Sequence, residues 1–162
     1  LTRAFDAHAA YLPPFEQHPD HVDFCRLTPE LSRDFRGLRV WLPIKMEGLG
    51  AFREALDEKL ALTAMVCDAV VSHDALELVT EPQLSTVAFK LKSTQSLESN
   101  NEQTRTMLEA INAPGKVFLT GTTLRGEFVI RVCILSFRTH REHAQRAIDA
   151  IYRAASELES AH

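Results

Sequence analysis

The chain has 162 residues, 45% of them hydrophobic, so it can bury one substantial core with few residues left for a second. Its net charge of −4 and pI near 6.0 argue against nucleic-acid binding, which normally requires an excess of basic residues. No apolar run approaches the ~20 residues of a membrane-spanning helix. We therefore expect neither nucleic acid nor membrane as a partner.

The cysteines indicate the redox environment. Cys25, Cys67 and Cys133 are far apart and odd in number. This pattern is typical of reduced thiols in a cytosolic protein rather than of a disulfide framework. It predicts a cytoplasmic location.

The first thirty residues differ from the rest of the chain. Any helix there is interrupted by four prolines: Pro13, Pro14, Pro19 and Pro29. After a short extended entry, we expect a long mobile loop from about Ala7 to Pro29. Loops of this length are usually lids, binding loops or linkers. The sequence therefore predicts a loop segment at residues 1–30 and a domain at residues 31–162.

Two helices are predicted next, because apolar residues recur three or four positions apart. The first runs from about Glu30 to Glu47, with Thr28 as its N-cap and a kink or restart at Pro43. It ends at Gly48-Leu49-Gly50. The second continues to about Val70.

Pairs of strands then alternate with helices. The predicted elements are strands at 76–81 and 87–91, a helix at about Asn101–Ile111, strands at Val117–Thr123 and Glu127–Leu135 joined by a tight hairpin at Leu124–Gly126, and a helix at about Arg141–Glu159. This order indicates an α+β fold. We expect a two-layer sandwich: a mainly antiparallel sheet of about four strands with helices on one face.

One stretch of the first helix is distinctive. Arg33, Arg36 and Arg39 form a row beside the apolar face, and Trp41 is expected in the core. By itself this is an amphipathic helix with a basic rim. Its Arg-x-Phe-Arg-x-Leu-x-x-Trp pattern, followed by Gly48, nevertheless resembles the start of the small C-terminal domain of the group II pyridoxal-phosphate-dependent amino-acid decarboxylases. This family includes the aromatic amino-acid, histidine, glutamate and diaminobutyrate enzymes.

Two more segments carry the resemblance. Residues 1–12, with Tyr11-Leu12, resemble the family's segment just beyond its cofactor-binding lysine, and Leu124–Arg131 resembles its final hairpin. The resemblance implies the C-terminal part of a cytosolic homodimeric enzyme that removes CO₂ from an L-amino acid. Pyridoxal 5'-phosphate would be bound covalently by a lysine outside this chain, in an Asn-Pro-His-Lys block expected upstream of Leu1. The isolated chain is therefore expected to be inactive. The alternative is a stand-alone α+β domain that binds a ligand or mediates oligomerisation without chemistry.

Tyr11 is the candidate catalytic residue. Without the resemblance it is an ordinary loop tyrosine beside Pro13 and Pro14. In the family, a tyrosine at this place reaches the active site of the neighbouring subunit, and its hydroxyl supplies a proton to the carbon that CO₂ has left. The resemblance implies the same role here, in a loop that also excludes water.

Arg131 and Ser32 are the candidate substrate-binding residues. Arg131 lies among apolar residues of a strand, where its burial requires an anionic partner. That partner is either a carboxylate of the protein, such as Glu127, or the substrate's α-carboxylate, as in the glutamate-type enzymes of the family. Ser32 either supports the helix start or borders the substrate side chain. In the family, glycine is usual at this place in aromatic-type enzymes and serine in histidine-type enzymes, so the resemblance implies that Ser32 disfavours a DOPA-type substrate without establishing histidine.

Metal binding is not expected. His18, His21 and Cys25 lie in the proline-rich loop, and His140 and His143 are only a pair. A zinc site needs three or four convergent ligands.

Overall fold

The computed structural model describes residues 29–30, 34–92 and 96–160. The chain divides into two compact units, Leu1–Gly48 and Leu49–His162, and each is described by itself. The predicted division between residues 1–30 and 31–162 stays a prediction, because residues 1–28 lie outside the described ranges. Within those ranges, no helix is both long and apolar enough to cross a membrane.

Helix α2, Arg36–Val71, is interrupted at Gly48 (φ 79°, ψ 160°). Only glycine adopts this backbone conformation without strain, which explains why the helix breaks there. The predicted junction at Gly48 is confirmed, whereas the predicted kink at Pro43 is wrong. Proline loses one hydrogen bond in a helix, but its fixed φ is compatible with helical geometry, and the dihedrals stay helical at Pro43.

The predicted start of this helix near Glu30 is also wrong, since α2 begins at Arg36. The Arg36 amide donates to the Asp34 carbonyl, and the Asp34 carboxylate pairs with Arg39. A carboxylate at a helix N-terminus is favourable because it compensates the helix dipole.

The sheet is antiparallel throughout and has the strand order β1-β2-β4-β3. Its strands are β1 Leu76–Thr80, β2 Thr86–Leu91, β3 Thr120–Leu124 and β4 Glu127–Cys133. The turn between β3 and β4 consists of Arg125 (φ 52°) and Gly126 (φ 88°). Two residues with positive φ are typical of a tight hairpin, so the predicted hairpin is confirmed.

Two helices complete the layer that packs on the sheet: α3, Leu97–Asn112, and α4, Arg141–Ser160. Helix α3 starts four residues earlier than predicted. The reason is Ser96, whose hydroxyl accepts a hydrogen bond from the Ser99 amide and caps the helix.

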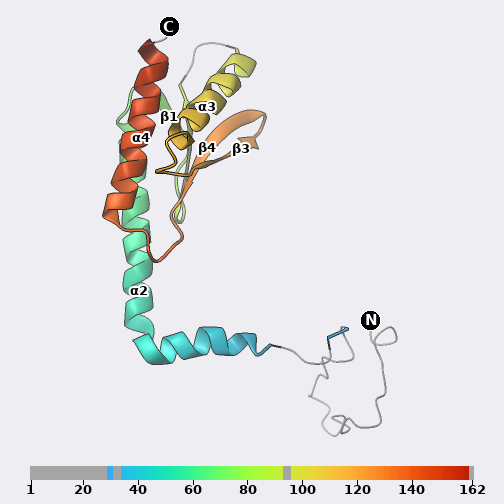
Figure 1. Cartoon of the computed structure of the whole chain (residues 1–162), viewed down its shortest axis with the longest axis vertical. Helices are drawn as coiled ribbons and strands as arrows, with labels where there is room; N and C mark the ends of the chain where they lie inside the picture. The colour runs from blue at the N-terminus through green and yellow to red at the C-terminus, as the bar shows by residue number, and fades with distance from the viewer. Residues whose placement is uncertain (1–28, 31–33, 93–95, 161–162) are drawn as a thin grey trace, which may run out of the picture. The chain divides into compact units, whose positions relative to one another are not determined.

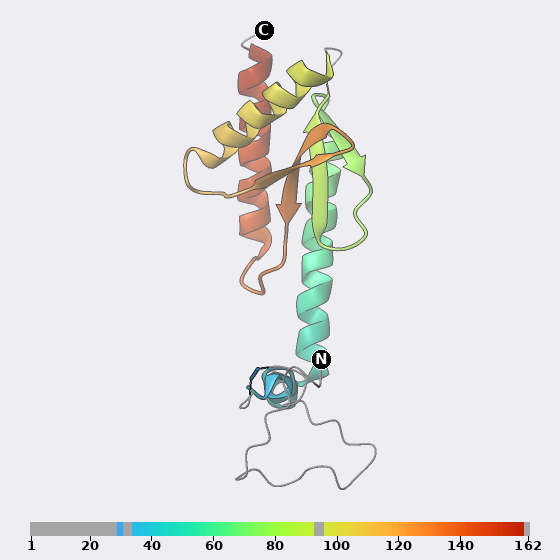
Figure 2. The same ribbon diagram turned by 90° about the vertical axis from the view of Figure 1, so that its right-hand side faces the viewer.

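The core lies between one face of the sheet and the helices (Figures 1 and 2). Its fully buried centre consists of Phe89 and Ile130 from the sheet, Val66 from α2, Met107 from α3 and Ile151 from α4. The predicted α+β sandwich, with helices on one face of a four-stranded sheet, is therefore confirmed.

The part of α2 before Gly48 exposes large apolar side chains. Met46 is 71% exposed and Trp41 56%, and Phe35, which precedes α2, is 72% exposed. The prediction that Trp41 lies in the core is therefore wrong for this chain. A helix that is apolar on several sides normally packs against other protein.

Candidate functional site: the open face of the sheet

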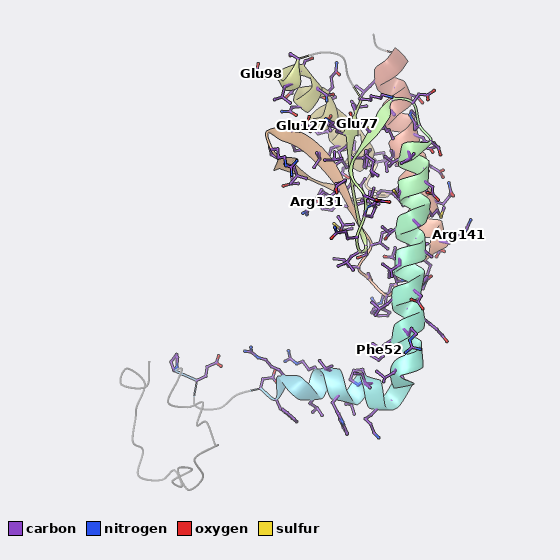
Figure 3. The ribbon with its side chains drawn as sticks, turned by 180° about the vertical axis from the view of Figure 1, so that it is seen from behind. Phe52, Glu77, Glu98, Glu127, Arg131 and Arg141 are labelled. Carbon is purple, nitrogen blue, oxygen red and sulfur yellow. The ribbon has the colours of Figure 1, made fainter. Side chains whose placement is uncertain are left out.

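The strands carry the candidate site on the face that the helices leave uncovered. Side chains alternate along a strand, so Ile130 and Val132 enter the core while Val129 and Arg131 point the other way. We define the open face by the side chains that the strand register places opposite the core face: Glu77, Ala88, Lys90, Glu127, Val129 and Arg131. Figure 3 labels Glu77, Glu127 and Arg131 among them. The predicted division of β4 into two faces is confirmed.

Arg131 lies at the middle of the open face. It pairs across the sheet with Ala88 on β2 and Thr120 on β3. Its Nε is buried without a hydrogen-bond partner, and one terminal nitrogen donates a long bond of 3.4 Å to the Thr120 hydroxyl. Among the described residues, no carboxylate pairs with this guanidinium.

The nearest glutamate on the same strand is already paired. The Lys90 ammonium donates to Glu127 Oε1 at 2.6 Å and lies 3.9 Å from Glu77 Oε2. Among the described residues, the suggestion that Glu127 is the structural partner of Arg131 is therefore wrong. The reason is the register: Phe89 pairs with Ile130, which brings Lys90 beside Glu127 from the neighbouring strand.

This arrangement leaves a cation able to bind a carboxylate. A guanidinium presents parallel N–H donors that match the two oxygens of a carboxylate. A buried N–H donor without a hydrogen-bond partner destabilises the folded protein. An acceptor that binds to it removes this cost. The open face thus presents the guanidinium of Arg131, which can bind an anion, beside the ion pair of Lys90 and Glu127.

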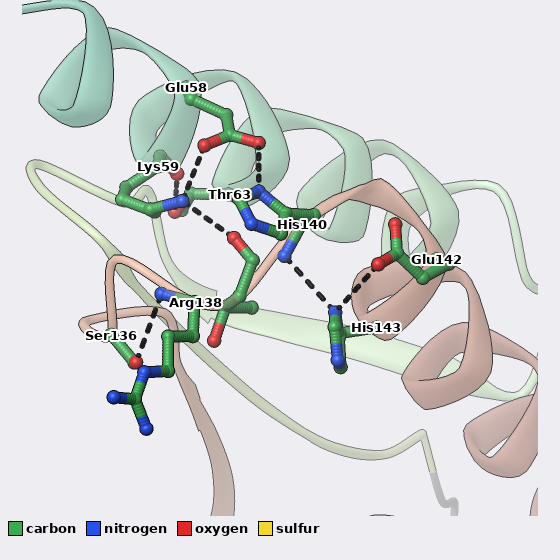
Figure 4. A network of polar contacts seen from close by, with 9 residues as sticks. Glu58, Lys59, Thr63, Ser136, Arg138, His140, Glu142 and His143 are labelled. Atoms are coloured by element: carbon green, nitrogen blue, oxygen red, sulfur yellow. Dashed lines mark hydrogen bonds and ion pairs between the residues drawn. The ribbon is translucent and has the colours of Figure 1, made fainter.

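A second polar cluster joins α2 to the start of α4 (Figure 4). Lys59, 5% exposed, donates to Glu58 Oε2 and to the Thr139 carbonyl, both at 2.6 Å. His140 Nδ1 lies 2.9 Å from Glu58 Oε1. Hydrogen bonds from Lys59 first, and then from His140, hold the pKa of Glu58 below its usual value of 4.5.

The sequence reasoning missed Lys59, although a signal was present. Lys59 falls on the same helical stripe as Leu62, Thr63 and Val66, all of which are buried. A lysine inside an apolar stripe indicates a paired, buried ammonium.

His140 and His143 interact at the start of helix α4. The His140 amide donates to His143 Nδ1 at 3.2 Å, as a capping side chain at this position does. Among the described residues, no group of three potential metal ligands occurs. His18, His21 and Cys25 lie outside the described ranges. The pKa of the Cys67 thiol is raised, mainly by burial, so this cysteine is a weak nucleophile.

Two of the three predicted site residues, Tyr11 and Ser32, lie outside the described residues, and their roles stay predictions. The described lysines do not fit a covalent pyridoxal-phosphate site either. Both buried lysines, Lys59 and Lys90, already bind carboxylates, while Lys45, Lys92 and Lys116 are exposed on the surface.

A protein-family model and curated proteins both match this chain. Residues 1–92 match the family model described as the pyridoxal-dependent decarboxylase conserved domain. An aromatic-L-amino-acid decarboxylase of Bacillus atrophaeus is 30% identical over 98% of this chain and 34% of its own length. The chain spans between a quarter and a third of the length of such curated relatives.

Solved structures agree with this match. Tryptophan decarboxylase of Catharanthus roseus in complex with L-tryptophan superposes with a TM-score of 0.79, at 25% identity, over 96% of this chain and 31% of that one. The 4-hydroxyphenylacetaldehyde synthase of Rhodiola rosea superposes with a TM-score of 0.77, at 28% identity, over 85% and 30%.

Proposed function

Because this chain belongs to the pyridoxal-dependent decarboxylase family, we propose that it is part of an enzyme that removes CO₂ from an L-amino acid to give an amine. Arg131 binds the substrate's α-carboxylate. The observation that supports this role is a guanidinium on the open face with no carboxylate partner among the described residues, while Glu127 is bound to Lys90.

The proposed cofactor is pyridoxal 5'-phosphate, held covalently by a lysine outside this chain. When bound, it withdraws electrons from the substrate carbon and so makes loss of CO₂ possible. This chain contributes residues that bind and protonate the substrate rather than the covalent link. By itself, the chain is therefore proposed to be inactive.

Tyr11 is proposed as the proton donor. A hydroxyl carried on a loop can close over the substrate, exclude water and deliver a proton to the carbon that has lost CO₂. Ser32 is proposed to border the substrate side chain. Both assignments rest on the family resemblance of the surrounding residues, and mutagenesis is needed to test them.

The proposed partner is the rest of the same enzyme, assembled as a homodimer in the cytoplasm. The exposed apolar side chains at the start of α2 and just before it support this proposal, since Phe35, Trp41 and Met46 would cost free energy if left in water. In the second unit, Leu49 and Leu56 on α2 are also exposed.

We propose aromatic L-amino acids as the substrate class, because the relatives include aromatic-L-amino-acid and tyrosine decarboxylases. Ser32 disfavours DOPA among them. The test is to assay the full-length enzyme, supplied with the cofactor, for CO₂ and amine from L-tyrosine, L-tryptophan, L-phenylalanine, DOPA, L-histidine and L-glutamate. Release from an aromatic substrate supports the proposal. Release from histidine or glutamate alone would refute the substrate class, and release from none would refute the activity.

The alternative is a non-catalytic α+β domain that binds a ligand or mediates oligomerisation. It is favoured by one observation: the unit Leu49–His162 has its own hydrophobic core. The genomic sequence distinguishes the two. A reading frame that encodes an Asn-Pro-His-Lys block upstream of Leu1 supports the enzyme, and a frame that starts near Leu1 supports the separate domain.

A further inference from the structure

Arg131 has a hydrogen-bond acceptor directly opposite it on the edge strand β3. That residue is Thr120, its register partner, and residues paired in this way point to the same face of the sheet. A terminal nitrogen of the guanidinium, Nη2, donates to the Thr120 hydroxyl oxygen at 3.4 Å. Among the described residues, this is the one hydrogen bond of the Arg131 side chain, since its Nε is buried without a partner.

On the side of β2, the residue opposite Arg131 has no polar side chain. This register partner is Ala88, which ends in a methyl group and is buried. Of the side chains that lie directly opposite Arg131 on the two neighbouring strands, only that of Thr120 can therefore accept a hydrogen bond from the guanidinium.

The orientation of the guanidinium decides whether it can bind a carboxylate well. Bidentate binding requires two parallel N–H donors that face the ligand, and an arginine side chain with several rotatable bonds loses conformational entropy when it is fixed in one orientation. Threonine is stiff at χ1, so the Thr120 hydroxyl is a well-placed acceptor. The guanidinium has more donors than one hydroxyl can occupy, so the bond to Thr120 leaves enough for a carboxylate.

We propose that Thr120 is a positioning residue of the substrate site: its hydroxyl holds the guanidinium of Arg131 in the orientation that receives the α-carboxylate. This inference rests on the proposed role of Arg131. Thr120 acts on substrate binding without touching the substrate, because its effect passes entirely through the guanidinium.

The test is steady-state kinetics of the full-length enzyme with its cofactor. The KM for L-tyrosine and L-tryptophan is compared with the inhibition constants of tyramine and tryptamine, which lack the carboxylate. Thr120→Val removes the hydroxyl from an exposed position but keeps the shape and β-branching, so it should fold as the parent does. We expect KM for the amino acids to rise about fivefold, the scale of one hydrogen bond. The kcat and the inhibition by the amines should stay unchanged, as when a contact contributes only to binding of the carboxylate.

Thr120→Ser and Thr122→Val are the matched variants. Serine keeps the hydroxyl, so Thr120→Ser should have a KM close to that of the parent. Thr122 lies on the same face of β3 but opposite Val129, so Thr122→Val should also retain the parent KM. The proposal is overturned by an unchanged KM in Thr120→Val, by an equal rise in either matched variant, or by equally weakened inhibition by the amines.

Arg131→Met separates positioning from direct contact with the substrate. In the Arg131→Met background, Thr120→Val should cause no further rise in KM, because no guanidinium remains to be oriented. A further rise would show that Thr120 acts on the substrate directly. If Arg131→Met raises KM but Thr120→Val does not, only the role of Thr120 is wrong. If Arg131→Met leaves KM unchanged, the carboxylate role of Arg131 is wrong, and the role of Thr120 is wrong with it.

Discussion

Arg131 and Lys90 are both cations on the open face, yet their surroundings differ. Lys90 has carboxylate oxygens from two strands beside it, whereas the guanidinium of Arg131 has only the Thr120 hydroxyl at 3.4 Å among the described residues. The first arrangement is a structural ion pair. The second leaves a cation that an anionic ligand can satisfy.

Arg131→Met in the full-length enzyme should therefore weaken substrate binding more than folding. Methionine retains much of the aliphatic length but removes the donors, and losing a bidentate contact costs on the order of 2–4 kcal/mol. Steady-state kinetics and thermal unfolding should be measured together. A collapsed melting temperature with an unchanged KM would make Arg131 a structural residue.

Tyr11→Phe keeps the ring but removes the proposed proton donor. Loss of CO₂ can continue, since it does not require the hydroxyl, but the substrate carbon stays open to oxygen. Amine formation should fall by roughly 10²-fold or more, as expected for loss of a general acid. Aldehyde, ammonia and O₂ consumption should replace it. Amine production at the parent rate would show that the proton comes from another group.

Gly121→Ala should destabilise the fold, because a Cβ there would clash with Cζ of the Phe128 ring. That ring is buried, and the Arg105 guanidinium lies over it, 4.0 Å from the centroid. Forcing it to move should cost about 1–3 kcal/mol. The free energies of unfolding of Gly121→Ala and Gly50→Ala should be compared by chemical denaturation. Gly50→Ala is the control, since a Cβ at Gly50 meets nothing within 4 Å. Equal stabilities would contradict this account.

At the scale of elements, the contact between α2 and the loop before α4 depends on a few polar groups. Lys59 on α2 donates to the Thr139 carbonyl, and Glu58 reaches His140 (Figure 4). The ammonium is buried, so the adjacent carboxylate must stay ionised to neutralise it. This coupling makes the contact sensitive to acid.

Glu58→Gln should flatten the acid dependence of stability. The pKa of Glu58 is lowered in the folded chain, so unfolding favours proton uptake and stability falls as pH falls. The contribution is fully present above the usual pKa of 4.5 and is lost as pH falls through the lower, folded value. Urea unfolding at several pH values below and above 4.5 measures this slope. Glu54→Gln, at an exposed glutamate of the same helix, should retain the parent slope. An unchanged slope in Glu58→Gln would show that Glu58 is not coupled to folding.

At the scale of the whole molecule, the unit Leu49–His162 has its own hydrophobic core. Both buried lysines are bound to carboxylates, and the chain spans at most about a third of the length of its curated relatives. The part of α2 before Gly48 exposes the apolar side chains of Trp41 and Met46.

The isolated chain should therefore not bind pyridoxal phosphate through one specific lysine. Borohydride treatment of the mixture, followed by peptide mapping, should find only traces of label spread over exposed lysines such as Lys45 and Lys116. The full-length enzyme, treated in the same way, serves as the positive control. Stoichiometric labelling of a single lysine in this chain would contradict the prediction.

The sequence alone determined the elements and the faces of the sheet. Apolar periodicity along each segment depends only on which side of that segment meets the core. The four strands and the inward face of α4 were therefore predictable. The hairpin at Arg125-Gly126 was predictable from its turn residues. The family resemblance was also carried by local motifs. The start of α2 was not predictable, because Asp34 and Arg39, rather than Thr28 and Pro29, lie at the helix end that forms.

Only the tertiary structure decided which charges meet. Glu127 could pair with Arg131 on its own strand or with Lys90 on the next, and composition and spacing allow both. The choice follows from strand order and register, which bring β2 beside β4 and Lys90 within 2.6 Å of Glu127. Pairing between strands depends on how the whole sheet closes over its core, and no local pattern encodes that closure.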